Sequence, residues 1–284
     1  TAKEKFARNI EAIKTLKSLE TESRRATAEE QEILSRYIGW GGLSEAFDDS
    51  KDNWHSEYTQ LKDLLTADEY SMARASTLNA HYTSPTVIRA MYKALGNMDI
   101  PNGNILEPAM GTGNFFGMLP QSMANSKLYG VELDSLTGRI AKQLYQKANI
   151  QIKGFEKTDY SNDFFDVAVG NVPFGNYKLN DKKYDKQNLL IHDYFFSKSL
   201  DKVRSGGIVA FITAKVNINK ESSEVRNQLA QKADLLGAIR LPNNAFKANA
   251  GTEVTSDIIF FQKRDHAPER LPDWVELGET AEGV

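Results

Sequence analysis

The sequence predicts an α/β fold, in which a mostly parallel sheet carries helices on both faces and follows an N-terminal helical subdomain. Three observations support this prediction. After residue 80, short apolar segments of strand length alternate with helical segments, a pattern typical of parallel sheets. Residues 1–78 show helical spacing instead. A Gly-containing turn separates the first predicted strand from a helix, at the position where open α/β sheets bind ligands.

The first 78 residues are predicted to form helices. Apolar residues recur at helical spacing from Phe6 to Leu19. The capping box Thr27-Ala28-Glu29-Glu30 begins a second helix, which is expected to stop at Gly39. The stretch Tyr58–Ser76 continues the helical pattern. We therefore divide the chain into a helical subdomain (1–78), a sheet domain (79–265) and a linker or tail (266–284), the last with two prolines and no strong periodicity.

Five short apolar strands are predicted in the second part of the chain. They are Asn104–Leu106, Lys127–Val131, Asp166–Val169, Gly207–Ile212 and Ile258–Phe261. The intervening helices include Val87–Leu95, Leu136–Ala148 and Asp193–Val203. Because the carboxyl ends of parallel strands lie at one edge of a sheet, motifs that follow these strands are expected to meet there.

Composition excludes several classes of function. The chain has no cysteine, so disulfides, thiolate metal sites and the covalent thiol mechanism that methylates carbon 5 of cytosine are impossible. We expect no metal, because the histidines lack ligand spacing. These are His55, His81, His192 and His266. No apolar run approaches the ~20 residues of a membrane span, and no targeting segment is evident, so we expect a cytoplasmic protein.

The net charge of −3 is unusual for a self-sufficient DNA binder, because phosphate contacts normally require a basic face. A nucleic-acid surface must therefore be local or supplied by a partner. The best local candidate is the loop Asn176–Asn188, which contains four lysines and two tyrosines. Lys178, Lys182 and Lys183 can contact phosphates while the tyrosines stack on bases, although an ordinary solvated loop is the alternative.

The turn Glu107–Phe116 follows the first predicted strand and opens a helix. Gly111 and Gly113 let the backbone pass close to a ligand that a side chain would displace. A Gly-x-Gly turn alone equally fits a nucleotide phosphate. A dinucleotide enzyme would have a third glycine for the pyrophosphate, and here Phe116 occupies that position. The candidate binding residues are Glu107, Ala109, Met110, Gly111, Thr112, Gly113, Asn114 and Phe115.

The end of the next strand favours one kind of ligand. Glu132 and Leu133 follow the strand Lys127–Val131, and Glu132 lies about twenty residues beyond the glycines, where an acidic side chain can bind both hydroxyls of a ribose. The alternative role is a helix cap, which Asp134 also fits. Together, the two motifs favour a nucleoside without phosphate, and we predict S-adenosylmethionine as the cofactor.

Two further segments fit this cofactor. Asp159 and Tyr160 precede the strand Asp166–Val169, and Asp159 can accept from the cofactor's adenine amino group or simply form a turn. A second set of candidates precedes the helix Val87–Leu95, namely Tyr82, Thr83, Ser84 and Pro85. Their hydroxyls and amides can bind the cofactor's carboxylate, or they can form an N-cap with proline in the first turn.

The tetrapeptide Asn171-Val172-Pro173-Phe174 follows the apolar run that ends at Gly170. A planar amino group is a poor nucleophile because its lone pair is delocalised, so its site must accept hydrogen bonds from both amino hydrogens. The Asn171 carboxamide oxygen and the Val172 carbonyl supply two acceptors. Pro173 favours an extended Val172, and Phe174 offers a face for stacking. The alternative is an ordinary turn after a strand.

In this order, the motifs resemble those of the amino-directed DNA adenine methyltransferases. The matching segments are Tyr82–Pro85, Glu107–Phe115, Glu132, Asp159 and Asn171–Phe174. More narrowly, three segments resemble the methylase portion of very large methylase-helicase proteins of phages, plasmids and conjugative elements. They are Tyr37–Leu43, Asn79–Pro85 and Gly251–Ile258. The resemblance spans roughly residues 5–265.

The resemblance implies a Rossmann-like S-adenosylmethionine-dependent methyltransferase sheet and direct transfer of a methyl group to the N6 amino group of adenine in DNA. Asn171 and the Val172 carbonyl would orient that amino group, and Phe174 would stack on the extruded base. Phe195 would border the cofactor's adenine, and Phe246 would form the other wall around the target. The implied partners are DNA and a helicase domain or a separate specificity subunit.

Two departures and two alternatives accompany this resemblance. The wider superfamily has proline at the position of Val172, but the backbone carbonyl survives, so we expect activity to be retained. Only 19 residues follow Asp265, too few for a target-recognition domain, so sequence specificity is expected to come from elsewhere or to be slight. The alternatives are a protein glutamine N5-methyltransferase, which handles a similar planar nitrogen, and a catalytically idle DNA-docking module of a helicase.

Overall fold

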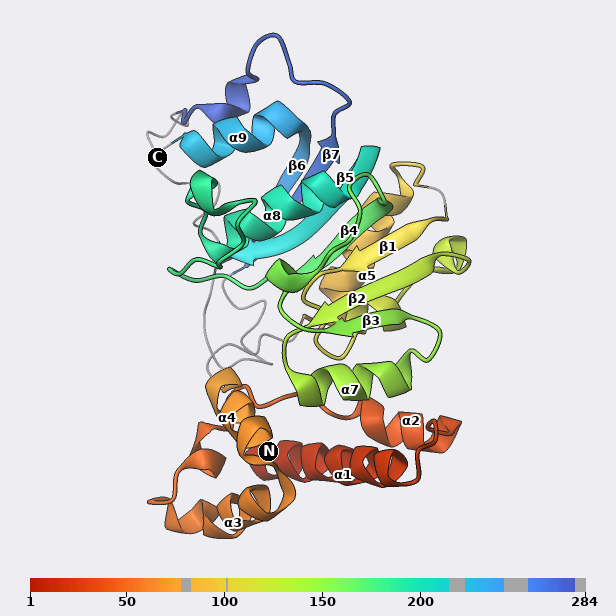
Figure 1. Cartoon of the computed structure of the whole chain (residues 1–284), viewed down its shortest axis with the longest axis vertical. Helices are drawn as coiled ribbons and strands as arrows, with labels where there is room; N and C mark the ends of the chain where they lie inside the picture. Colours follow the sequence, from red (N-terminus) through yellow and green to blue (C-terminus); the bar gives the residue numbers. More distant parts are fainter. Residues whose placement is uncertain (78–82, 101, 215–222, 243–254, 279–284) are drawn as a thin grey trace.

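The computed structural model describes residues 1–77, 83–100, 102–214, 223–242 and 255–278, and it confirms the predicted α/β class (Figure 1). Seven strands form one sheet in the order β3-β2-β1-β4-β5-β7-β6. Their bounds are β1 Asn104–Glu107, β2 Lys127–Glu132, β3 Asn149–Ile152, β4 Phe165–Asn171, β5 Val203–Ala214, β6 Ala233–Arg240 and β7 Ser256–Lys263. Within the described residues, all strand pairs are parallel except those made by β7.

Helices cover both faces of the sheet because its central strands are apolar on both sides. Along β5, Ile208 packs on the face covered by α5 (Pro85–Gly96). The alternate residue Val209 packs on the opposite face, against α8 (Ile191–Lys202) and α9 (Glu224–Lys232). The strand ends that carry the motifs therefore lie at the edge of a doubly covered sheet.

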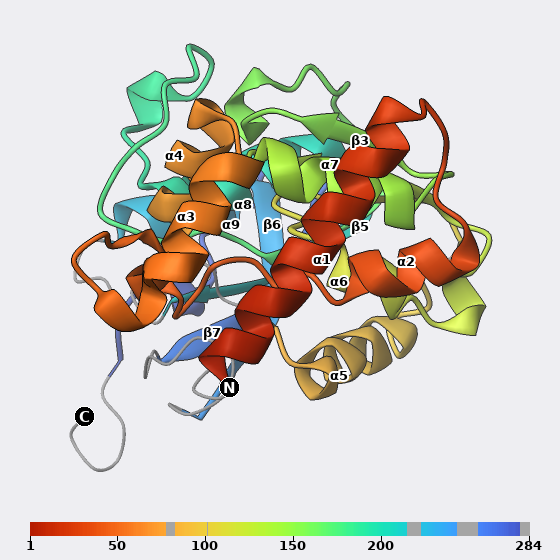
Figure 2. The ribbon, with the colours of Figure 1, turned by 90° about the horizontal axis from the view of Figure 1, so that it is seen from below.

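The N-terminal helices pack against α7 (Ser135–Leu144), which lies between them and the strand β3 (Figure 1). Their bounds are α1 Ala2–Thr21, α2 Ala28–Ser35, α3 His55–Leu64 and α4 Ala67–Ser76. Their apolar residues share one core cluster with Leu136 and Ile140 of α7. Seen from below, α1 crosses in front of α7 (Figure 2). Arg139 on α7 strengthens this junction through ion pairs with Glu20 and Glu69.

Some elements differ from the prediction. The helix α2 ends at Ser35, so Tyr37 and Ile38 lie in the turn that follows it. The strands β3 and β6 were not predicted, because β3 has only four residues with two polar ones among them, and β6 is an edge strand that is largely exposed. The helix α6 (Asn114–Gly117) after the Gly-containing turn is a single turn long.

Part of the predicted linker or tail packs against the fold. Residues Asp273–Val275 form a 3-10 helix in which Val275 is buried. The Arg226 Nε donates to the Val275 carbonyl at 2.6 Å, and the Trp274 ring lies 5.7 Å from that of Phe261. An apolar pair in this otherwise polar stretch is therefore enough to hold it. The predicted boundary near residue 78 falls outside the described residues, so the domain division stays a prediction.

In the described part of the chain, no helix has both the length and the apolar character needed to cross a bilayer. In the same residues, no three side chains of the metal-ligating types His, Asp and Glu come together as a metal site.

Candidate active site

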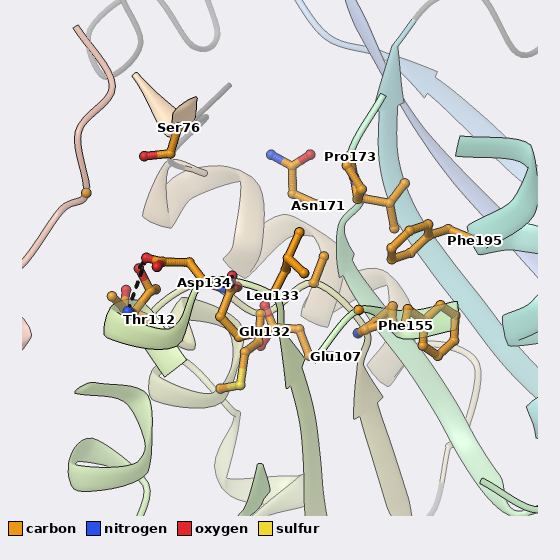
Figure 3. Close-up of a pocket in the computed structure, with 18 of the residues that line it drawn as sticks. Ser76, Glu107, Thr112, Glu132, Leu133, Asp134, Phe155, Asn171, Pro173 and Phe195 are labelled. Carbon is orange, nitrogen blue, oxygen red and sulfur yellow. Dashed lines mark hydrogen bonds between the residues drawn. The ribbon is translucent and has the colours of Figure 1, made fainter. Parts of the chain in front are cut away.

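A cavity of about 660 Å³ lies at the carboxyl edge of the sheet (Figure 3). The ends of β1, β2 and β4 meet there, as the parallel strands predict. The predicted site residues that line it are Thr83, Glu107, Ala109, Met110, Gly111, Thr112, Asn114, Phe115, Glu132, Leu133, Asn171, Val172, Pro173, Phe174 and Phe195. Residues far apart in the sequence thus surround one space.

The turn after β1 needs both of its glycines. Gly111 has a φ of +55° and Gly113 a φ of +83°, in the left-handed region that favours glycine. A Cβ on Gly113 would lie 2.4 Å from the ring of Tyr145, so this glycine also permits close packing. A Cβ on Gly111 would meet nothing within 4 Å. Gly111 is therefore needed for its backbone conformation beside the cavity.

Glu132 connects this turn to the end of β2. Its two carboxylate oxygens accept from the backbone N–H groups of Gly111 at 2.8 Å and Asp134 at 2.7 Å. Burial raises the pKa of Glu132 to about 7. Asp134 caps α7 by accepting from the backbone N–H groups of Leu136 and Thr137. The capping role therefore belongs to Asp134, and Glu132 faces the cavity.

Glu107, the last residue of β1, is a second carboxyl group beside the cavity. Its side chain is 2% exposed, and within the described residues its Oε2 has no hydrogen-bond partner. Burial, followed by the nearby Glu132 charge, raises the pKa of Glu107 well above its ordinary value. A buried carboxyl oxygen without a partner is costly. It is well suited to a ligand that brings a donor or a positive charge.

Apolar side chains form the next part of the wall. Leu133 is 64% exposed, although it is a large apolar residue, and it projects toward the cavity (Figure 3). The rings of Phe155 and Phe195 face the same space, with their centroids 5.1 Å apart. An exposed leucine beside two aromatic rings provides a surface on which a planar ring can bind.

Asn171 lies at the end of β4, at the rim of the cavity (Figure 3). Its Nδ2 donates to the Oγ1 of buried Thr83 at 3.1 Å, which fixes the orientation of the carboxamide. Val172 prolongs the strand by donating its N–H to the Ile212 carbonyl at 3.1 Å, and its side chain enters the core. The tetrapeptide is therefore held to the sheet through Val172.

Several predicted residues lie away from the cavity. Asp159 is exposed, and Tyr160 packs edge-on against Tyr129 and Phe165. Neither lines the cavity. The reason is the unpredicted strand β3, which ends at Ile152 and brings the turn Gly154-Phe155-Glu156 to the carboxyl edge instead.

The remaining predicted residues either do not line the cavity or lie outside the described part of the chain. The Ser84 Oγ accepts from the Val87 N–H at 3.4 Å, so Ser84 and Pro85 act as the N-cap and first turn of α5. Tyr82 and Phe246 lie outside the described residues. Lys178 and Lys182 are exposed on the loop after the tetrapeptide, whereas the exposed Lys183 lies 3.9 Å from Asp201.

The N-terminal segment supplies lining residues that were not predicted. These are Tyr37, Ile38, Gly39, Met72, Ala75 and Ser76. Fully buried Asn9 on α1 holds the turn after α2, because its Nδ2 donates to the Gly39 carbonyl at 2.7 Å and its Oδ1 accepts from the Ile38 N–H at 3.0 Å. In the sequence, the Gly-rich stretch beginning at Gly39 indicated the end of a helix, and Tyr37–Leu43 carried part of the family resemblance, but neither observation placed these residues at the cavity.

Known proteins are similar to this chain in sequence and in fold. Residues 65–273 match the family model of the N-6 DNA methylases. The "Defense against restriction protein B" of Escherichia phage P1 is 29% identical over 271 residues, which are 93% of this chain but 10% of that protein. Modification methylase CviBIII of Paramecium bursaria Chlorella virus NC1A is 27% identical over 163 residues, 56% of this chain and 43% of the relative. The chain thus spans less than half the length of either relative.

Solved structures show the same fold at low sequence identity. A Listeria monocytogenes protein classed among the class I S-adenosylmethionine-dependent methyltransferases superposes with a TM-score of 0.55 at 17% identity, over 94% of this chain and 91% of that one. The methyltransferase subunit of a type I restriction-modification system from Streptococcus thermophilus gives 0.53 at 13%, over 92% and 79%. The predicted Rossmann-like methyltransferase sheet is confirmed. The match of residues 65–273 to the family model establishes that the chain belongs to the N-6 DNA methylase family.

Proposed function

We propose that this chain transfers a methyl group from S-adenosylmethionine to the exocyclic N6 amino group of adenine in DNA. One observation carries the proposal. The Asn171 carboxamide, oriented by Thr83, borders the same cavity as the Gly111 turn and Glu132. Membership in the N-6 DNA methylase family supports this assignment, as do the names of the viral relatives, one a modification methylase and the other a defence against restriction.

The residues of the cavity fit S-adenosylmethionine. Each Glu132 oxygen accepts one backbone N–H and retains acceptor capacity for a ribose hydroxyl. The buried, unpartnered Oε2 of Glu107 suits the ammonium group of the methionine part. Leu133 and the rings of Phe155 and Phe195 suit the adenine. When bound, the cofactor supplies a methyl group on a positively charged sulfur.

The chain's own contribution to the chemistry is to reshape the amino group of the target. In the proposal, the Asn171 Oδ1 and the Val172 carbonyl each accept one amino hydrogen, so the nitrogen lone pair turns out of conjugation and toward the methyl group. The hydrogen bond from Asn171 Nδ2 to Thr83 prevents the carboxamide from presenting its nitrogen instead. After the new N–C bond forms and the C–S bond breaks, the positively charged nitrogen releases a proton to water, so no strong base is needed.

The target base must leave the duplex to reach this site, because an N6 group within a base pair is inaccessible to the rim of the cavity. Half-buried Phe174 is the proposed stacking surface. We assign phosphate contacts to Lys178, Lys182 and Lys183 on the following loop, where all three are exposed. Since the phage relative is about ten times longer than the matched part, a helicase domain or a specificity subunit is the proposed source of further DNA contacts.

A labelling experiment tests the proposal. The chain is incubated with methyl-labelled S-adenosylmethionine and either unmethylated DNA or a protein extract, and the products are hydrolysed and analysed by mass spectrometry. We expect N6-methyladenine in the DNA. Label recovered as N5-methylglutamine would instead establish a protein methyltransferase. A calorimetric titration without cofactor binding would support the idle docking module.

A further inference from the structure

Lys198 on α8 is a buried lysine that the proposed chemistry does not use. Its side chain is 3% exposed, although lysine is among the residues that are least often buried. Its Nζ donates to the Phe155 carbonyl at 2.8 Å and to the Asp181 Oδ2 at 3.0 Å. It also lies 5.0 Å from the centre of the Phe155 ring, within the range of a cation–π contact. Such a buried charge persists only where its partners are well placed.

The two partners of Lys198 belong to different walls of the cavity. Phe155 lines the cavity from the turn after β3. Asp181 belongs to the loop Asn176–Asn188, whose residues Tyr177 and Leu179 line the same cavity from the side of the tetrapeptide. One ammonium group therefore connects the wall assigned to the cofactor's adenine with the loop assigned to the DNA.

The loop is also attached to α8 at its two ends, because the Tyr177 carbonyl accepts from the Ile191 N–H at 2.9 Å and the Gln187 Oε1 accepts from the Ser197 Oγ at 3.1 Å. The Tyr194 hydroxyl also donates to the Asp181 Oδ2, at 2.7 Å, and so strengthens the same anchor. Tyr184 is buried and donates to the Asp201 Oδ2 at 2.6 Å. The chain between these anchors leaves Lys182 and Lys183 exposed. A shift of Asp181 would therefore move the residues that face the cavity and the lysines that face solvent together.

We propose that Lys198 is a positioning residue that couples the cofactor site to the loop Asn176–Asn188, an inference that rests on the proposed function. A cofactor that packs against Phe155 fixes the carbonyl to which Lys198 donates, and Lys198 in turn fixes Asp181 and the loop. The coupling is reciprocal. If the bound cofactor increases the affinity for a substrate that orders the loop, that substrate increases the affinity for the cofactor by the same factor.

Lys202 provides a matched control on the same helix. It is also buried, and its Nζ donates to the Tyr160 carbonyl at 2.6 Å and to the Asn162 Oδ1 at 2.9 Å. Tyr160 does not line the cavity. The substitutions Lys198→Met and Lys202→Met therefore remove equivalent buried ammonium groups and leave equivalent carbonyls without a donor. They differ in which carbonyl is affected and in the second acceptor, which is the Asp181 carboxylate for Lys198 and the Asn162 side-chain amide for Lys202.

The test measures hydrogen exchange of the full 284-residue chain with and without S-adenosylhomocysteine, together with the affinity for this ligand by calorimetry. In the wild type, we expect the ligand to slow the exchange of loop amides about tenfold. Lys198→Met should lose this protection and bind the ligand about tenfold more weakly, the loss expected for one charge-assisted hydrogen bond. Lys202→Met should keep both properties. Asp181→Ala, which removes the acceptor that the loop offers to Lys198, should lose loop protection while binding the ligand within about threefold of the wild type.

The outcomes separate the two proposals. Equal ligand affinity and equal loop protection in the Lys198→Met and Lys202→Met proteins would overturn the coupling and leave the proposed function standing. A wild-type loop that shows no protection upon ligand binding would do the same. Failure of the wild type to bind the ligand would overturn the proposed function, and the coupling with it. If Lys198→Met does not fold, unchanged loop protection in Asp181→Ala refutes the coupling.

Discussion

The two sides of the cavity are lined by different kinds of residue. The strand ends contribute charged and polar groups, represented by Glu107, Glu132 and Asn171. The N-terminal segment contributes mostly apolar or small residues, such as Ile38 and Met72. A strand end is fixed by the ladder of the sheet and therefore positions chemical groups accurately. The N-terminal helices pack against α7 through side chains and therefore provide shape and closure.

The hydrogen bonds that hold the lining residues in place also differ between the two sides. On the strand side, the lining groups hold one another, as in the bonds from Gly111 to Glu132 and from Asn171 to Thr83. On the N-terminal side, the turn at Ile38 is held by one buried amide, Asn9. Substitutions on the strand side should therefore alter catalysis and charge-dependent binding. Those on the N-terminal side should alter affinity and stability together.

The largest effect is expected from Asn171→Ala. Loss of the amide should reduce methyl transfer by roughly 10³-fold, because it removes an acceptor that acts on the reacting amino group. Cofactor affinity should stay within about twofold. Single-turnover rates and calorimetry measure the two quantities. The matched control is Asn53→Ala, an exposed asparagine outside the cavity lining. A transfer rate that survives Asn171→Ala would remove the proposed mechanism.

Glu132→Gln should act on cofactor binding. Loss of the charged acceptor should weaken binding about tenfold at pH 8, the size expected for charge-assisted hydrogen bonds. Because the pKa of Glu132 is about 7, wild-type affinity should rise as the pH increases from 6 to 8, as the carboxylate forms. The variant should depend less on pH over this range, since Glu107, whose pKa is also raised by burial, remains as a carboxyl group beside the cofactor. Calorimetric titrations at both pH values test this, and equal pH dependence of the two proteins would contradict it.

The same residue predicts a pH effect on the stability of the free chain. Between the ordinary carboxyl pKa of 4.5 and about 7, the folded state retains the Glu132 proton that the unfolded state has lost. Stability from this group is therefore present below pH 4.5 and is lost as the pH rises through 7. Glu132→Gln does not titrate, although its amide nitrogen leaves one of the two backbone N–H groups without an acceptor. Between pH 6 and pH 8, the Tm of the wild type should therefore fall by a few degrees relative to that of Glu132→Gln. An equal change of Tm in the two proteins would show that the Glu132 proton does not affect stability.

A smaller effect on binding is expected from the N-terminal side. Asn9→Ala leaves the Gly39 carbonyl and the Ile38 N–H without their partner, which should lower the free energy of unfolding by about 2 kcal/mol. Cofactor affinity should fall about threefold as the turn loosens. Denaturant unfolding and calorimetry give both values. Thr15→Ala, on the same helix, should change neither property. Unchanged cofactor affinity in Asn9→Ala would mean that the N-terminal wall only closes the cavity.

The smallest effect concerns the loop. Lys182→Ala should reduce DNA affinity about twofold at moderate salt and lower the salt slope by about 1, because one phosphate contact is lost. Binding titrations at several salt concentrations measure the slope. Lys14→Ala, which removes an exposed lysine from α1, serves as the control. If the two variants have the same slope, the loop does not contact phosphates.

Parts of the fold and of the site could be predicted from local patterns. The strand that ends at Asn171 was predicted because its residues are buried on both faces and read as an apolar run. Gly111 and Glu132 were placed together by their spacing across one strand and one helix. The strand β3 was missed because four residues with little apolar content give almost no periodic signal. Because β3 was missed, Asp159 was predicted to contact the cofactor, whereas Phe155 is the residue that lines the cavity.

The sequence by itself determined which chemical groups stand at the strand ends. Positive φ values at Gly111 and Gly113 and the restriction imposed by Pro173 are local properties, and the order of the strands along the chain follows from connectivity. Only the tertiary structure decided what faces these groups. The approach of Ile38 to the cavity and the contact of Lys198 with Phe155 depend on how α1, α2 and α8 pack. Side-chain packing between distant segments leaves no periodic trace in a single sequence, because it depends on the volume and shape of both partners.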